Sequence, residues 1–180
     1  DGKALRNPIC PLGYILLANP IREAAKETFE YFTEQGVEVK VISGDNPVTV
    51  SKVAKQAGIA NADQYVDASE LKSINDVKKA VLENTVFGRV TPNQKRQFVQ
   101  VLKEAGKTVA MTGDGVNDVL ALKDADCSIA MASGSEAAAQ AAQVVLLESD
   151  FSKMPSVVLE GRRVVNTIER SASLFLVMNI

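Results

Sequence analysis

The chain has 180 residues, 46% of them hydrophobic, which is enough for one well-packed domain with a sizeable core. Its formal net charge of −2 and its lack of a long basic run argue against a nucleic-acid partner or an anionic lipid surface. Histidine is absent, which excludes histidine-based triads and most zinc sites, so acid–base or metal chemistry is left to carboxylates and lysine. Cys10 and Cys127 fit no metal-site spacing, and they indicate a reduced, cytosolic compartment.

The first half of the chain alternates short apolar runs with amphipathic helices. Three helices are expected to begin with a capping residue and a proline, at Asn19-Pro20, Asn46-Pro47 and Thr91-Pro92. These helices are expected to end near Gly36, Gly58 and Gly106. Strands are predicted at residues 13–18, 37–43 and 85–89, an irregular segment at 59–73 and a helix at 76–83.

The second half continues this alternation. Strands are predicted at 108–111, 128–131 and 144–147, and helices at 116–124, at 135–142 and from 152 onward. Strand–helix alternation with nearly continuous apolar strands predicts an α/β fold, a Rossmann-like parallel sheet with helices on both faces. Ligands bind such sheets at the carboxyl ends of the strands, so functional residues are expected there.

The sequences at the two ends of the chain bear on targeting and on membrane insertion. The chain starts at Asp1 without a methionine and shows no signal-peptide pattern. The apolar run 173–180 is shorter than the roughly 20 residues that a membrane-spanning helix requires. Two interpretations stay open: the start of a membrane helix, or the buried end of a C-terminal helix.

The most informative motif follows the strand at 108–111 and reads Thr112-Gly113-Asp114-Gly115-Val116-Asn117-Asp118. Its glycines are expected to permit a tight turn with positive φ and a close backbone approach. Asp114 and Asp118 lie four residues apart where the turn enters a helix, so they can share a side. Because neighbouring carboxylates repel unless a cation lies between them, the motif predicts a Mg²⁺ site. The alternative, in which Asp114 caps the helix and Asp118 complements its dipole, is disfavoured by the complete motif.

Two other strands end in residues suited to phosphate. Ser43, Gly44 and Asp45 place a hydroxyl and a glycine amide at a helix N-terminus, which suits an anion site or an ordinary capped turn. Lys95 lies in a first helical turn, where the dipole disfavours a cation, so it either neutralises a phosphate or is simply solvated. Arg89 either reaches a nucleotide or pairs with a surface acid. Together these residues suit phosphoryl transfer, although the P-loop and dinucleotide-binding patterns are absent.

The order Ser-Gly-Asp, Lys, Gly-Asp-Gly-x-Asn-Asp resembles the haloacid dehalogenase superfamily and, within it, the phosphorylation domain of P-type cation-transporting ATPases. The matching stretches cover nearly the whole chain: 19–22, 41–46, 87–92, 111–132, 144–151 and 160–162. The resemblance implies a partial phosphorylation domain at residues 1–151 and, at 152–180, a stalk helix that enters a truncated membrane helix. The family's nucleophile, in Asp-Lys-Thr-Gly-Thr, is absent, so the sheet is expected to lack the central strand that carries it.

The resemblance also implies roles for matching residues. Asp114 would be the Mg²⁺ ligand supported by Asp118, Asn117 would touch the phosphoryl group, and Lys95 would neutralise an aspartyl phosphate. Ser43, where the family has threonine, and Gly44 would hold phosphate oxygens. Arg89, Asp45 and Lys95 would bind ATP. Asn19 stands where the family has aspartate, so a carboxylate role there is weakened while helix capping is kept.

The implied function is part of an ATP-driven cation pump on the cytoplasmic face of a membrane, with Mg²⁺ and ATP as cofactors. Ca²⁺ is the expected cation by overall resemblance, and the membrane contacts lie beyond the C-terminus. The fragment alone is expected to be inactive because the nucleophile and the nucleotide-binding domain are missing. Two alternatives stay open: a soluble Mg²⁺-dependent phosphatase of the same superfamily, and a non-catalytic α/β binding domain.

Overall fold

The computed structural model describes residues 13 and 20–178, and the description below concerns this part of the chain. Its strands form two parallel three-stranded sheets. One has the order β1 (Val41–Ile42), β3 (Val86–Gly88) and β2 (Tyr65–Asp67). The other has the order β4 (Ala110–Gly113), β5 (Cys127–Met131) and β6 (Val144–Leu146). The predicted α/β class with parallel strands is confirmed, and within the described residues β1 and β4 each pair with a single strand.

Helices follow the strands, and local sequence signals start several of them. The α-helices are α1 (Ala25–Glu34), α2 (Pro47–Gln56), α3 (Ile74–Glu83), α4 (Pro92–Glu104), α5 (Val119–Asp124), α6 (Glu136–Ala141) and α7 (Met154–Met178). Short 3₁₀ turns are η1 (Ala68–Glu70), η2 (Val116–Asp118) and η3 (Phe151–Lys153). At α2 the Asn46 side chain accepts from the Val48 amide at 3.0 Å. At α4, Thr91 and Gln94 form a capping box. Two of the three predicted proline-started helices are therefore confirmed.

Several predicted boundaries are wrong; the strand predicted at 108–111, for example, is observed at Ala110–Gly113. Helix α1 begins at Ala25, not at Pro20, and its N-cap residue Ala24 makes no side-chain hydrogen bond. Asn19 lies outside the described residues, and so does all of the predicted strand 13–18 except Gly13. The segment 59–73 contains β2 and η1, because Tyr65 and Val66 find ladder partners on β3. Helix α3 starts at Ile74, since Ser73 and Asp76 form a capping box. Strand 37–43 is reduced to two residues, because it pairs only with the short β3.

Alternate residues of the central strands face two different cores, so each sheet is covered on both faces. On β3, Val86 packs with Val50 and Ala54 of α2, whereas Phe87 packs with residues of α3 and α4. On β5, Ala130 packs with residues of α5 and α6, whereas Ile129 packs against Met154 of α7. This confirms the predicted helical layers, since successive side chains of a strand point to opposite faces.

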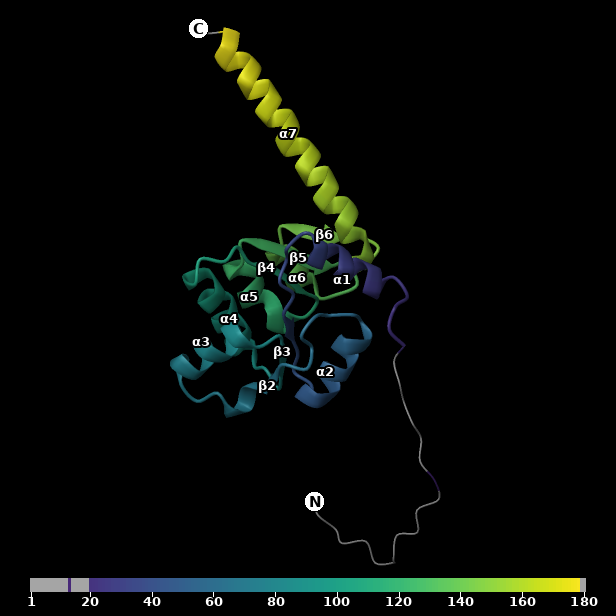
Figure 1. Ribbon diagram of the computed structural model, residues 1–180, viewed down its shortest axis with the longest axis vertical. Coiled ribbons are helices and arrows are strands. Elements are labelled where there is room, and N and C mark those ends of the chain that lie inside the picture. Colours follow the sequence, from purple (N-terminus) through teal and green to yellow (C-terminus); the bar gives the residue numbers. More distant parts are fainter. Residues whose placement is uncertain (1–12, 14–19, 179–180) are drawn as a thin grey trace, which may run out of the picture.

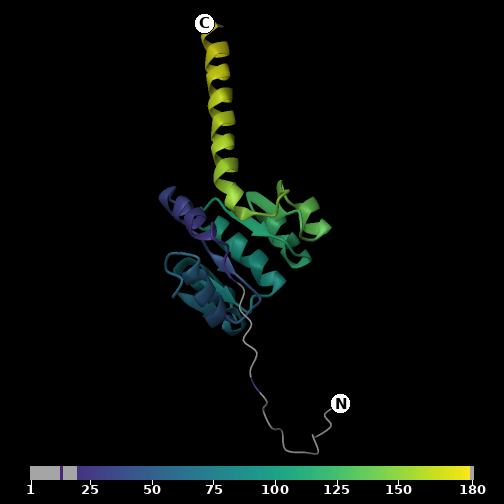
Figure 2. The ribbon, with the colours of Figure 1, turned by 90° about the vertical axis from the view of Figure 1, so that its right-hand side faces the viewer.

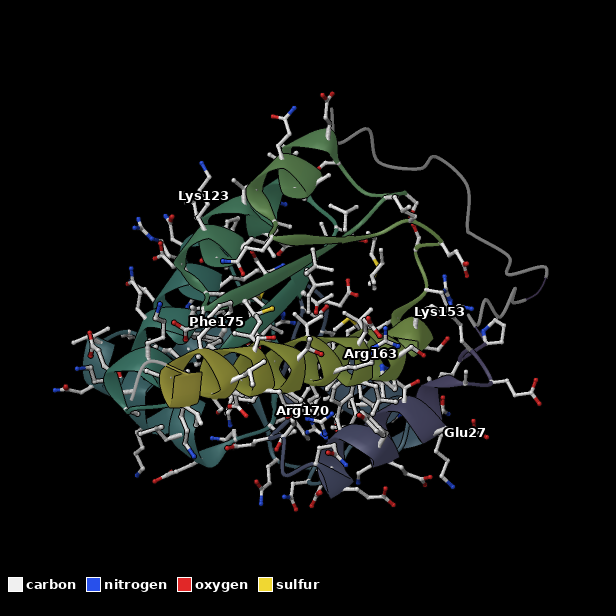
Figure 3. The ribbon with its side chains drawn as sticks, turned by 90° about the horizontal axis from the view of Figure 1, so that it is seen from above. Glu27, Lys123, Lys153, Arg163, Arg170 and Phe175 are labelled. Carbon is white, nitrogen blue, oxygen red and sulfur yellow. The ribbon has the colours of Figure 1, made fainter. Side chains whose placement is uncertain are left out.

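Helix α7 leaves the body of the protein and extends well beyond it in two perpendicular views (Figures 1 and 2). Its base is held where Phe29 and Phe32 of α1 contact Phe151, with ring centroids 6.2 and 5.8 Å apart. Seen from above, Arg163, Arg170 and Phe175 lie along the helix and Lys153 lies at its base (Figure 3). The apolar side chains at positions 174–177 are 62–72% exposed. None of the helices among the described residues is both long and apolar enough to cross a bilayer.

The contact between α4 and α5 predicts a loss of stability in acid. Arg96 donates to Asp124 at 2.7 Å, as does Gln100, and the Arg96 bond is the main cause of the lowered pKa of Asp124. A carboxylate whose pKa is lower in the folded state stabilises the fold above its unfolded value, about 3.9. We therefore expect unfolding to become easier as pH falls through that value towards the lowered pKa. Urea denaturation over this range should show a shallower decline for Asp124→Asn, and parallel curves would contradict the assignment.

Candidate functional site

The loop after β4 brings Asp118 back against the strand it follows. A Cβ atom added at Gly113 would lie 2.5 Å from Cβ of Asp118, so this position has room only for glycine. The expected positive φ is wrong, since the described glycines with positive φ are at 36, 58 and 106, and Gly115 has a φ of −105°. The close approach is confirmed at Gly113, whose backbone lies against the side chain of Asp118, and it is the physical reason for this glycine.

Lys95 and Asp118 form a shielded ion pair. The Lys95 Nζ lies 2.6 Å from Oδ1 of Asp118, and these side chains are 15% and 8% exposed. The second oxygen of Asp118 accepts from the Gly115 amide at 3.2 Å. The interpretation of Lys95 as a simply solvated lysine is therefore wrong. Both oxygens of Asp118 are engaged by groups of the chain itself.

The same pair shows that two strand ends lie on one side of the molecule. Lys95 sits in the first turn of α4, directly after β3, yet it bonds to Asp118, directly after β4. The carboxyl ends of β3 and β4 must therefore open on the same side, as expected for an α/β ligand site. A cavity lined by residues such as Lys40, Gln64 and Thr85, each just before a strand, lies at the opposite ends and contains none of the candidate residues.

Asp114 and Asn117 are exposed at this edge. The side chains near Asp114 decide whether the expected Mg²⁺ could bind there. Among the described residues no three acidic, cysteine or histidine side chains are grouped as a metal site would require. Mg²⁺, however, usually keeps several waters and binds one or two carboxylates together with substrate phosphates. The donors present thus fit Mg²⁺ held through Asp114, while the carboxylate of Asp118 is engaged by Lys95 and the Gly115 amide.

The loop after β1 is a capped turn that is tied to the end of β3. The Ser43 hydroxyl accepts from the Asp45 amide at 3.1 Å, which is the bond expected of an ordinary turn. The amides of Arg89 and Val90 donate to the carbonyls of Asp45 and Ser43 at 2.8 and 3.0 Å. Gly44 is exposed, and no atom would crowd a Cβ there. The structure therefore brings Ser43, Gly44, Asp45 and Arg89 together in one group.

Arg89 is held at both its backbone and its side chain. Its φ of 52° lies in the left-handed region, which costs a residue other than glycine roughly 1–2 kcal/mol. Its guanidinium donates to Asp67 at 2.7 Å, so of the two expectations for Arg89 the acid pair is observed. Sequence reasoning missed Asp67. The available signal was local, because Asp67 also accepts from the Ser69 amide and hydroxyl, and these bonds are the main cause of its lowered pKa.

A parallel α/β domain whose charged side chains gather at the carboxyl ends of its strands belongs to the class in which ligands bind at that edge. Residues 3–126, more than half of the chain, match the family described as haloacid dehalogenase-like hydrolase. The chain therefore belongs to the haloacid dehalogenase-like hydrolase family.

Its similar proteins include cation-transporting ATPases. The "Probable cation-transporting ATPase exp7" of Streptococcus pneumoniae is 51% identical over 169 residues, which are 94% of this chain and 22% of that protein. The calcium-transporting ATPase CtpE of Mycobacterium bovis is 49% identical over 173 residues, 96% of this chain and 22% of that protein. The resemblance to P-type cation-transporting ATPases is confirmed, and the chain spans 22% of the length of these relatives.

Solved structures agree with this relationship. The catalytic domain of the CPx-ATPase CopB-B superposes with a TM-score of 0.59 at 25% identity, covering 76% of this chain and 45% of that one. A zinc-transporting PIB-type ATPase in its E2.Pi state superposes with a TM-score of 0.66 at 22% identity, covering 84% of this chain and 21% of that one. The second comparison is evidence for the fold alone.

Proposed function

We propose that this chain is the phosphorylation-domain segment of an ATP-driven cation pump that passes through an aspartyl phosphate. Residues 1–151 are the partial phosphorylation domain, and residues 152–180 are the stalk helix leading to the membrane. The domain lies at the cytoplasmic face of that membrane. The nucleophile, the nucleotide-binding domain and the ion sites lie in other parts of the protein, so this segment alone does not turn over ATP.

The observation that carries the proposal is the shielded Lys95–Asp118 pair beside an exposed Asp114 at one strand edge. Asp118 holds the ammonium group of Lys95 in place. The Lys95 side chain therefore does not have to be ordered before its positive charge neutralises phosphate. Such preorganised charge is the main contribution of a protein to phosphoryl transfer. Asn117 contacts the phosphoryl group. The similarity to relatives that are named as cation-transporting ATPases favours a pump over a soluble phosphatase.

The remaining residues hold the nucleotide and its phosphates. Ser43 and the Gly44 amide bind phosphate oxygens at the N-terminus of α2, where the helix dipole favours anions. Arg89 and Asp45, which are joined by a backbone hydrogen bond, contact ATP together with Lys95, and Arg89 exchanges its Asp67 partner for ATP when the nucleotide binds. Asp114, supported by Asp118, would hold Mg²⁺. When bound there, Mg²⁺ would neutralise charge on the transferring phosphoryl group.

The test uses the full-length protein that contains this segment. It is mixed with labelled ATP and Mg²⁺, quenched in acid and assayed for a phosphoprotein that hydroxylamine cleaves. We expect labelling of the wild type and a loss of at least about a hundredfold in the labelling rate of Asp114→Asn, because the metal ligand is removed.

Asp63→Asn is the matched control, since Asp63 is an exposed carboxylate just before the amino end of β2. It should be labelled like the wild type. Absence of labelling in a folded wild type would rule out the pump proposal. The remaining functions would then be the soluble phosphatase and the non-catalytic binding domain.

Ca²⁺ is the proposed transported cation, because a relative that is 49% identical is named as calcium-transporting. A relative at 34% identity, from Salmonella typhimurium, is named as magnesium-transporting, so the ion needs its own measurement. The same full-length protein in vesicles tests it, through uptake of labelled Ca²⁺ that depends on ATP. Uptake of another cation in its place would overturn this part of the proposal.

A further inference from the structure

The turn after β5 packs directly on the backbone of Asp114. The Ser135 amide donates to the Asp114 carbonyl oxygen at 2.7 Å. A Cβ atom added at Gly134 would lie 2.4 Å from that oxygen and 2.9 Å from Cα of Asp114. Both contacts are with backbone, which cannot swing aside as a long side chain can. Any side chain at position 134 must therefore displace Asp114 or the turn itself.

The turn is fixed from its other side as well. The Gly134 amide donates to the Met131 carbonyl at 3.0 Å, and the Ser133 amide donates to the Ser149 hydroxyl at 2.8 Å. The Ser135 hydroxyl accepts from the Ala138 amide and so caps α6. Because of these bonds the turn cannot easily move away from Asp114. A larger residue at position 134 would therefore displace the backbone of Asp114.

We propose that Gly134 is a positioning residue for Asp114: its missing side chain allows the turn 132–135 to hold the Asp114 backbone where the carboxylate can serve Mg²⁺. This inference rests on the proposed function for the metal role of Asp114. Gly134 touches no ligand itself and acts only through the backbone of Asp114. It is separate from the steric requirement at Gly113, which concerns Asp118.

The test is a titration of this chain with Mg²⁺ alone, followed by the ¹⁵N–¹H signals of Gly113, Asp114 and Gly115. We expect these signals in Gly134→Ala to be shifted before metal is added. We also expect half-saturation of Gly134→Ala to require at least about ten times more Mg²⁺ than the wild type. The reason is that misplacing a functional group by about 1 Å can reduce its effect on the order of a hundredfold.

Two control variants separate position from stability. Gly161→Ala is the matched glycine control, since no atom lies within 4 Å of a Cβ there, and it should titrate like the wild type. Ser135→Ala removes the α6 cap but keeps the amide that bonds to Asp114, so it should melt at a lower temperature and still titrate like the wild type. Thermal melts of all variants show that each is folded.

The outcomes distinguish the inference from the function on which it rests. A wild type that responds to Mg²⁺ together with an unchanged Gly134→Ala titration would overturn the positioning role alone. A wild type whose Asp114 signal does not respond would overturn the metal role of Asp114, and the inference with it. If Gly134→Ala does not fold, Ser149→Ala replaces it. Ser149→Ala removes the hydroxyl that accepts from the Ser133 amide and braces the turn, and normal Mg²⁺ affinity in this variant would again overturn the inference.

Discussion

Replacing Lys95 with methionine is expected to lower the free energy of unfolding by about 3 kcal/mol, since removal of one partner leaves a shielded charge uncompensated. The pair is 2.6 Å apart and Asp118 is only 8% exposed, so water can replace the lost ammonium only poorly. Methionine keeps most of the length and apolar volume of lysine, so the effect isolates the charge. Urea denaturation of both proteins at neutral pH gives the difference.

The double variant Lys95→Met/Asp118→Asn serves as the control for this prediction. Asparagine removes the charge of Asp118 but keeps an oxygen that can accept from the Gly115 amide. The double variant should therefore recover more than half of the stability lost in Lys95→Met, and the mutant cycle reports the coupling between the two side chains. A single variant that loses well under about 1 kcal/mol would mean that solvent reaches the pair as it does at a surface.

Replacing Phe98 with alanine is expected to cost about 3–5 kcal/mol, the range for a large aromatic side chain removed from a core. Phe98 of α4 is 1% exposed, and its ring meets that of Phe87 on β3 edge to face, with centroids 4.9 Å apart. The substitution opens a cavity between helix and sheet and removes the aromatic contact. The measurement is urea denaturation, read together with the slope of the transition.

Leu82→Ala is the comparison for Phe98→Ala. Leu82 lies on α3 in the same half of the protein but is 49% exposed, so its truncation should cost well under about 2 kcal/mol. Equal losses in the two variants would contradict the placement of Phe98 in the core. A loss in Phe98→Ala accompanied by a changed denaturant slope would indicate a less cooperative transition and not a simple cavity.

Local signals were sufficient for much of the fold. Asn46-Pro47 and Thr91-Pro92 predict where α2 and α4 begin, because the bonds of a helix cap join residues two or three positions apart. The Gly-Asp-Gly motif likewise indicates a functional loop after β4. Signals of this kind need no knowledge of distant neighbours, and the capping box of Ser73 and Asp76 at the start of α3 is another of them.

Tertiary structure decided everything that depends on distant partners. Strand β2 has three residues, too few to show a period, and it exists because β3 supplies its ladder. The partner of Arg89 is 22 residues away and that of Lys95 is 23, so neither ion pair could be predicted from spacing along the chain. The sequence alone thus determined the residue types and the local turns of the candidate site. Only the packing of α4 against the loop after β4 brings Lys95 next to Asp118. The reason is that a buried charge pairs with an opposite charge that the tertiary structure places within contact distance.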